Sequence, residues 1–195
     1  LEAPDFYLQI VLEQAYRVAA HKDWTPEVRF AALTVFGRLN WEFPNQPGRH
    51  AMYRSLHSHI AELEGNWSFE NCTFKSVFFT NISGSIVFHD CVLVNSIWEN
   101  STGKLDFTAW NSDITHAYFR GPFREINLIG DLCDNTSFDH VEADLFNFRK
   151  LTANGMLFKN CVVEDLTLQA NKYHDVEPRF SKINWRNRGD AIDSI

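Results

Sequence analysis

Residues suited to a protein interior recur along the C-terminal half of the chain with an unusual spacing of five. From Phe123 onward the spacing holds without a break at Phe123, Leu128, Cys133, Phe138, Ala143, Phe148, Ala153, Phe158, Val163 and Leu168. The apolar positions of a helix repeat about every 3.6 residues, and those of a half-buried strand every second residue. A repeat of five fits neither element, and it therefore predicts a solenoid of stacked coils.

The same spacing is present earlier in the chain, but it is interrupted there. It holds for Phe69, Phe74 and Phe79, and again for Phe88, Leu93 and Trp98. The segment 80–85 breaks the register, and the longer stretch 99–108 interrupts it before Ile114 and Phe119. A slip of one residue at Gly121 and Pro122 then leads into the regular run. Interruptions of this kind are expected to form loops on the solenoid.

Four sides of five residues make a coil of about twenty, so residues twenty apart should stack about 4.8 Å from one another. We expect five coils, with Phe138 stacked on Phe158, and with Leu128, Phe148 and Leu168 in a second inner column. The expected core includes Phe74, Phe88, Leu93, Leu128, Phe138, Phe148, Phe158, Val163, Leu168, Cys72, Cys91 and Cys161.

The first 65 residues have a helical pattern and are expected to cap the solenoid. One helix is expected from Asp5, and a second after Thr25, whose hydroxyl suits an N-cap before Pro26. A third helix is expected from Met52 to Leu63. The sequence thus divides into a helical cap (1–65), a repeat region (66–175) and a tail (176–195) that forms a further cap or a dimer contact.

The four cysteines are interpreted as packing residues. No two of them form a C-x-x-C pair, and no zinc-ligand spacing surrounds them. Cys72, Cys91 and Cys161 each lie two residues before an inward apolar residue, a position that a small buried thiol fills well.

The blocks Asn71–Phe74, Asp90–Leu93 and Asn160–Val163 resemble the pentapeptide repeat, whose pattern is Ala-Asp/Asn-Leu-x-x. This resemblance implies a mainly β protein, a right-handed quadrilateral β-helix. The segments 27–33 and 49–62 are similar to a helical region that precedes the repeats in many bacterial members. Together the two resemblances cover about residues 5–170.

The chain departs from the repeat pattern at the position that the family fills with a small residue. Large side chains stand there at Ile126, Val141, Phe146, Leu151 and Met156. Asp131 falls in the same position and would place a carboxylate inside the coil. Because an unpaired buried carboxylate is costly, we expect an irregular coil near residues 129–135.

Composition and charge disfavour further classes of function. The net charge of −7 disfavours direct binding to nucleic acid, which needs clustered Lys and Arg. The sequence has no apolar run of membrane-spanning length and no secretory leader. We therefore expect a cytoplasmic protein, tethered to a membrane only through a segment upstream of Leu1.

No strong catalytic or metal-binding pattern is present, so we expect neither an enzyme nor a cofactor. His89, Asp90 and Cys91 are adjacent, but neighbours on a strand point to opposite sides. His50 and His57 have Arg54 between them on the expected helix, and His59 points elsewhere, which disfavours a metal site.

The best candidates for partner binding lie at the longest interruption. Lys104 and Phe107 belong to it, and Trp110 and Tyr118 follow it and would face outward. Exposed aromatic residues beside a loop are typical of docking patches. The alternative is that these residues pack under the loop itself.

The leading hypothesis is a non-enzymatic protein–protein interaction module, the soluble part of a longer, membrane-tethered protein. The alternative is an acidic mimic of DNA that inhibits a type II topoisomerase, as the family resemblance implies for some members. Residues 66–175 carry a net charge of −6. Stacking of Arg124 by Asp144 and of Asp139 by Lys159 would neutralise part of it. Five coils are also shorter than one turn of DNA, about 34 Å, so mimicry would need a homodimer formed through Phe180, Ile183 and Trp185.

Overall fold

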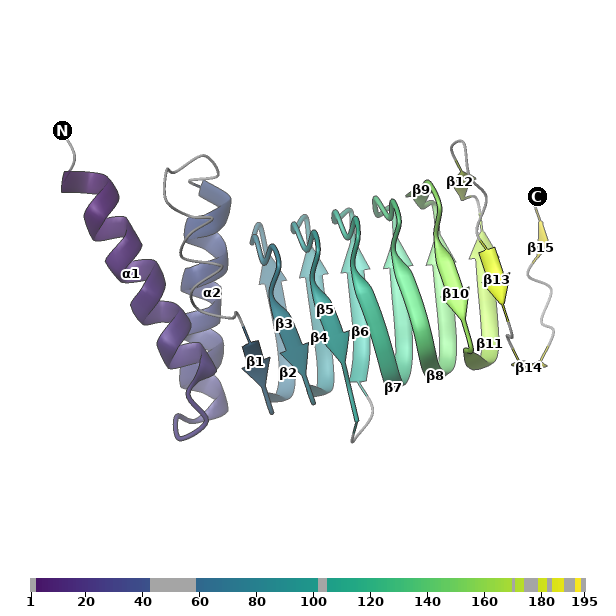
Figure 1. Cartoon of the computed structure of the whole chain (residues 1–195), viewed down its shortest axis with the longest axis horizontal. Helices are drawn as coiled ribbons and strands as arrows, with labels where there is room; N and C mark the ends of the chain where they lie inside the picture. The colour runs from purple at the N-terminus through teal and green to yellow at the C-terminus, as the bar shows by residue number, and fades with distance from the viewer. Residues whose placement is uncertain are drawn as a thin grey trace.

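The computed structural model describes residues 3–42, 59–101, 105–169, 171–173, 179–181, 184–187 and 192–193. Two helices, α1 (Ala3–Ala20) and α2 (Pro26–Glu42), lie against one end of a parallel β-solenoid of about five turns (Figure 1). The strands are β1 (His59–Ala61), β2 (Glu64–Glu70), β3 (Phe78–Thr80), β4 (Ser83–His89), β5 (Ile97–Glu99), β6 (Leu105–Trp110), β7 (Tyr118–Ile129), β8 (Ser137–Arg149), β9 (Thr152–Ala153), β10 (Leu157–Lys159), β11 (Val162–Gln169), β12 (Lys172–Tyr173), β13 (Arg179–Ser181), β14 (Asn184–Asn187) and β15 (Ile192–Asp193). The predicted fold class is confirmed.

The strand pairing shows four sides in each coil. Phe138 pairs with Phe158, Ala143 with Val163, and Phe148 with Leu168. Isolated bridges, among them Leu132 with Thr152, join the coils along the fourth side. The two inner columns predicted from the spacing of five are therefore both present.

Stacked aromatic rings fill one side of the solenoid from the inside. Phe79 and Trp98 stack with centroids 4.0 Å apart and planes 7° apart, and Phe138 and Phe158 stack at 4.8 Å and 7°. Phe119 continues the column at 5.0 Å from Phe138. Such contacts add to the stabilisation from burial of apolar area. Of the predicted core residues, Leu168 is only half-buried, and all the others are buried.

One half of every coil keeps the spacing of five, and the other half absorbs the interruptions. The half-coils Phe69–Phe79, Phe88–Trp98, Ala109–Phe119, Leu128–Phe138 and Phe148–Phe158 have identical lengths. The opposite half shortens at Gly121, where the β7–β8 register shifts and φ is +94°. A Cβ at this glycine would lie 1.7 Å from the carbonyl oxygen of Asn100, so only glycine fits the predicted slip.

Corners between the sides lie two residues after inward positions and have a left-handed backbone. Asparagine tolerates this conformation better than other non-glycine residues. It occupies six of the positive-φ positions: Asn71, Asn81, Asn95, Asn111, Asn135 and Asn160. This requirement explains why the repeat region contains so many Asn-rich turns.

The start of the solenoid differs from its predicted position. Residues 59–61 and 64–70 form β1 and β2, so the third helix does not extend to Leu63 and the solenoid begins before residue 66. Ile60 pairs with Phe79 and fills the inner column of the first coil, where its burial outweighs a local helical pattern. The rest of that predicted helix, with His50 and His57, lies outside the described residues.

The predicted tail continues the solenoid where it is described. β13 pairs with β10, and β14 and β15 pair with β11, all in parallel. The backbones of these three strands, which lie within 176–195, therefore extend the parallel strand pairing of the last coil.

The coil around Asp131 is regular, which corrects the expected irregularity at 129–135. Leu132 keeps its bridges to Asp113 and Thr152. One carboxylate oxygen of Asp131 accepts a hydrogen bond from the backbone N–H of Ser112 at 2.6 Å, and the other accepts one from Ile129 at 2.7 Å. These two donors satisfy the buried carboxylate, while burial raises its pKa to about 7.

Candidate functional site

The predicted docking patch beside residues 99–108 does not form as expected. Phe107 is fully buried, because it lies two residues before Ala109 on β6 and points inward with it. Its ring packs in the core, tilted against Phe88 and edge-on against Phe119. Phe107 is therefore a core residue and not a partner-binding residue. Lys104 lies outside the described residues.

Trp110 and Tyr118 are both on the outside, but they belong to different sides of the solenoid. Trp110 lies between His89 and Ile129 in one column of strands. Tyr118 pairs with Ile97 and Ser137 in another, and its hydroxyl donates to Asp139 at 3.2 Å. The two rings therefore do not form one patch. Half of the predicted loop is strand, since β5 ends at Glu99 and β6 begins at Leu105.

The group His89, Asp90 and Cys91 is separated by the coil. The His89 ring packs on the outside against Trp110, with centroids 4.4 Å apart. Cys91 is buried, and its thiol donates to the carbonyl oxygen of His89 at 3.2 Å. Asp90 forms the corner between them, with φ of +50°. The imidazole and the thiol thus lie on opposite sides of the chain.

The other cysteines are buried and reduced as well. Burial raises the pKa of both Cys133 and Cys161. Within the described part of the chain, no group of three His, Cys, Asp or Glu residues is placed to hold a metal ion. The cysteines therefore pack the interior, as the sequence predicts.

Exposed apolar residues gather on the helical cap. Among the described residues, seven of the ten large hydrophobic side chains that are exposed belong to α1, α2 and the turn between them. They are Tyr7, Ile10, Val11, Trp24, Val28, Val35 and Trp41. The remaining three, Ile97, Trp110 and Leu132, are scattered on the solenoid. A cluster of apolar residues at one end marks the strongest candidate for a contact surface.

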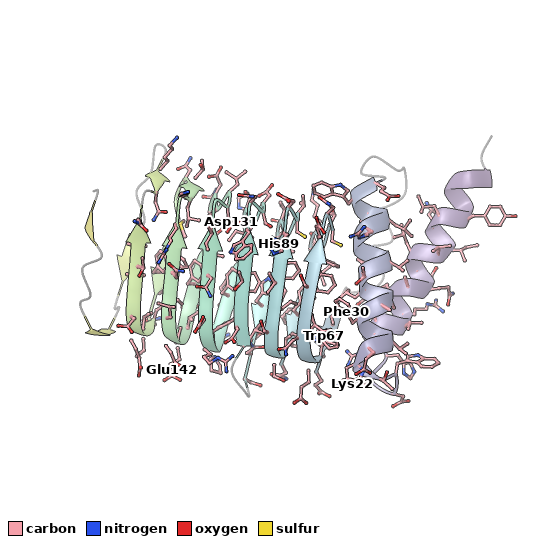
Figure 2. The ribbon with its side chains drawn as sticks, turned by 180° about the vertical axis from the view of Figure 1, so that it is seen from behind. Lys22, Phe30, Trp67, His89, Asp131 and Glu142 are labelled. Carbon is pink, nitrogen blue, oxygen red and sulfur yellow. The ribbon has the colours of Figure 1, made fainter. Side chains whose placement is uncertain are left out.

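The inner side of α2 is docked closely on the first coil. Phe30 stacks on Trp67 with centroids 4.8 Å apart, and both lie at the junction of helix and solenoid (Figure 2). A Cβ at Gly37 would lie 2.6 Å from the Phe74 ring, so glycine permits this approach. The carbonyl oxygen of Gly37 also accepts a hydrogen bond from the backbone N–H of Thr73 at 2.9 Å. This side of α2 is therefore fixed.

A buried arginine joins both helices to the first strand. The Arg29 guanidinium donates to the carbonyl oxygens of Ala19 at 2.8 Å, Glu62 at 2.9 Å and Ala61 at 2.5 Å. The first of these carbonyls is at the C-terminus of α1, where a positive charge is favourable. Nearby, Lys22 and Glu62 form an ion pair at 2.5 Å. The cap is thus held in one orientation on the solenoid.

The side of the cap that faces away from the solenoid is apolar across both helices. Helical spacing places Gly37 and Phe30 toward the solenoid, and Tyr16 toward Phe36 of α2 and the β1 backbone. The opposite side, which we call the outer cap face, carries Val11, Val18, Val28, Ala31 and Val35. Val11, Val28 and Val35 expose 40% or more of their surface, whereas the neighbouring Ala15, Ala32 and Leu39 are partly buried and pack against the hydrophobic core.

The apolar residues of this face are visible in the sequence, but hydrophobic periodicity alone does not distinguish them from the residues of α2 that dock on the solenoid. The apolar residues of α2 lie on two sides of the helix instead of one. A helix with a single buried side shows one apolar stripe, whereas a helix that is apolar all round is covered on every side. Without the structure, the two stripes merge into one broad face. The docking of Gly37 on Phe74 separates them.

No helix in the described ranges has both the length and the apolar character needed to cross a membrane. No protein-family model matches the chain, and a comparison with curated proteins gives no match.

Proposed function

We propose that the protein is a non-enzymatic protein–protein interaction module, whose contact surface is the outer cap face. The observation that carries this proposal is the clustering of exposed apolar residues on α1 and α2, which are fixed to the solenoid by Arg29. A rigid surface loses little conformational entropy when a partner binds. The solenoid then acts as the support that positions the cap.

The solenoid supports a finer assignment to the pentapeptide-repeat family. Its coils contain about twenty residues, and buried small residues precede buried large ones, as Cys72 precedes Phe74 and Cys91 precedes Leu93. We further propose that the protein works in the cytoplasm, with any membrane attachment supplied by a segment upstream of Leu1.

Photo-cross-linking tests the proposed surface directly. A benzophenone amino acid replaces Val35 on the outer cap face, and the control replaces Ile97, which is exposed to a similar degree on the solenoid. We expect cross-linked protein products in the native host at position 35 and none at position 97. Equal labelling at both positions, or no product at position 35, would contradict the proposal.

A second candidate, inhibition of a type II topoisomerase by DNA mimicry, is favoured by one feature. Glu142, Asp144, Glu164 and Asp165 lie along one side of the last two coils (Figure 2 labels Glu142). The candidate predicts inhibition of gyrase supercoiling at micromolar concentration, and an inert protein would exclude it.

A further inference from the structure

Two of the four cysteines lie next to each other in neighbouring coils. Thr73 pairs with Val92, and Cys72 and Cys91 are the residues that come directly before them. The backbone N–H of Val92 donates to the carbonyl oxygen of Cys72 at 2.9 Å, which fixes the register of the two coils at this point. Neighbouring strands lie about 4.8 Å apart, and the Cα atoms of a disulfide lie about 4.4–6.8 Å apart. The backbone therefore holds the two cysteines within disulfide range.

Both thiols are buried and have equivalent positions in the two coils. The thiol of Cys72 donates to the carbonyl oxygen of Glu70 at 3.5 Å, and the thiol of Cys91 donates to that of His89 at 3.2 Å. Glu70 and His89 are themselves paired between the coils. The sulfur of Cys91 also lies 3.6 Å from the carbonyl oxygen of Phe69, so it reaches the first coil. The two side chains therefore point to the same inner corner of the solenoid.

The other two cysteines have no such neighbour. By the register of the coils, Cys133 lies between Ile114 and Ala153, and Cys161 lies next to Val141. Both are as deeply buried as Cys72. They therefore serve as internal controls, since they share its burial and have no cysteine beside them.

A positive charge adjoins Cys72 at the joint between the cap and the solenoid. A Cβ at Gly37 would lie 2.9 Å from the Cβ of Cys72, so the backbone of α2 lies directly on this cysteine. The next residue, Arg38, is exposed, and its guanidinium hydrogen-bonds to the thiol. A hydrogen bond from Cys91, followed by the charge of Arg38, lowers the pKa of Cys72. Because the thiolate is the form that reacts with oxidants, Cys72 is the more reactive of the pair.

We propose that Cys72 and Cys91 form a reversible oxidation site, in which a peroxide oxidises Cys72 and Cys91 then closes a disulfide between the first two coils. Both thiols are buried, so the oxidant has to be as small as hydrogen peroxide and to enter beside the exposed Arg38. The inference does not depend on the outer cap face, because it concerns the opposite side of α2.

The reaction has two balanced steps. The thiolate of Cys72 attacks one peroxide oxygen, so that an S–O bond forms, the O–O bond breaks, and hydroxide leaves and takes up a proton as water. The sulfur of Cys91 then attacks the sulfenic acid on Cys72, so that the S–S bond forms and the S–O bond breaks. The departing hydroxide takes the Cys91 proton and leaves as a second water. The two sulfurs lose two electrons and the peroxide gains them.

Mass spectrometry of the full chain tests the proposed pairing. The protein is treated with hydrogen peroxide, unfolded, alkylated and digested. We expect one disulfide, between the peptides of Cys72 and Cys91, with Cys133 and Cys161 alkylated, and we expect dithiothreitol to restore four alkylated thiols. A disulfide between any other pair, four alkylated cysteines after the treatment, or oxidation of Cys72 that leaves Cys91 free would overturn the inference.

Serine variants separate the roles of the two thiols. Ser112 follows Cys91 in the same column, and its hydroxyl donates to the carbonyl oxygen of Trp110 at 3.0 Å, so serine fits this corner. In Cys91→Ser, we expect peroxide to leave a sulfenic acid on Cys72 that dimedone labels. In Cys72→Ser, we expect Cys91 to stay unlabelled. Labelling of Cys91 as fast as that of Cys72 would contradict the assigned order of reaction.

Substitution of Arg38 tests its activating charge. Arg38→Gln should slow disulfide formation several-fold, whereas Arg38→Lys should retain most of the rate, because it keeps the charge. Arg17→Gln, which removes only the exposed pair with Glu13 on α1, should react like the parent. If Arg38 only held the cap closed, Arg38→Gln would admit the oxidant and speed the reaction. An unchanged or faster rate in Arg38→Gln would therefore exclude activation by this arginine.

Discussion

The solenoid and the helical cap differ in the polarity of their outer surfaces. Along each strand of the solenoid, inward residues are apolar and most outward residues are polar, as in β8, where Phe146 and Phe148 are buried beside Asn147. On its outside, amide side chains bond from coil to coil, and Asn147 donates to Asn127 at 3.0 Å. On the cap, apolar residues cover the side docked on the solenoid and also the outer cap face. The solenoid thus completes its own interior, whereas the cap retains an exposed apolar side.

The difference has a simple geometric origin. A strand residue points either in or out, so alternation separates core from surface within one element. A helix distributes its residues around an axis and can bury two sides against two different neighbours. The predictions below compare how much the interior of the solenoid, the joint between cap and solenoid, and the outer surfaces each contribute to the free energy of unfolding.

The largest effect is expected inside the solenoid. Phe138→Ala removes a ring that stacks between Phe119 and Phe158 and should lower the free energy of unfolding by about 3–5 kcal/mol. Leu157→Ala, on the outer side of a neighbouring strand, should cost less than about 1 kcal/mol. Urea denaturation measures both. Equal stability of the Phe138→Ala variant and the parent would mean that the stacked column does not support the solenoid.

The joint between cap and solenoid should be the next most sensitive place. Arg29→Met keeps much of the side-chain volume but leaves the carbonyl oxygens of Ala19, Ala61 and Glu62 without this donor. We expect a loss of about 2–3 kcal/mol in thermal or urea unfolding. Arg17→Met, which removes only an exposed ion pair with Glu13, should cost less than about 0.5 kcal/mol. Comparable losses in the two variants would show that the Arg29 contacts do not anchor the cap.

The buried carboxylate of Asp131 should make stability depend on pH. Its pKa is raised to about 7 by burial, so between pH 4 and 7 the folded protein holds a proton that the unfolded chain releases. Stability from this group is therefore full below about pH 4 and is lost as pH rises through about 7. The free energy of unfolding should fall by about 1–2 kcal/mol from pH 5 to pH 7 relative to Asp131→Asn, which cannot titrate. Parallel pH profiles of the two proteins would refute this assignment.

The smallest effect is expected on the outside of the solenoid. Trp110 is 41% exposed and packs edge-on against His89. Trp110→Ala should lower stability by about 1 kcal/mol or less, because the ring is already partly exposed. Thermal unfolding of the variant beside the parent measures the change. A loss as large as that of Phe138→Ala would contradict the distinction between the interior and the outside of the solenoid.

Individual residues show why some parts of the fold could be predicted and others not. Phe138 and Phe158 could be paired because a coil of constant length converts sequence distance into spatial distance. Phe107 was wrongly expected on the surface, because the stretch before it does not keep the spacing of five. Counting back five residues from Ile114 gives Ala109 as an inward position, and alternation along the strand then points Phe107 inward as well. Asp131 was expected to disturb its coil, because its two backbone donors, Ser112 and Ile129, are revealed only by the strand register.

The sequence by itself determined the solenoid, its inner columns and the role of the cysteines, since these follow from a local repeat that each coil satisfies in the same way. The tertiary structure decided where the first coil begins, which aromatic residues share a side, and which side of α2 remains free. These depend on contacts between segments far apart in the chain, such as Gly37 with Phe74 and Arg29 with Ala61. Hydrophobic periodicity shows how many sides of a helix are apolar. Only the packing of the helix against its neighbours shows which of those sides is buried.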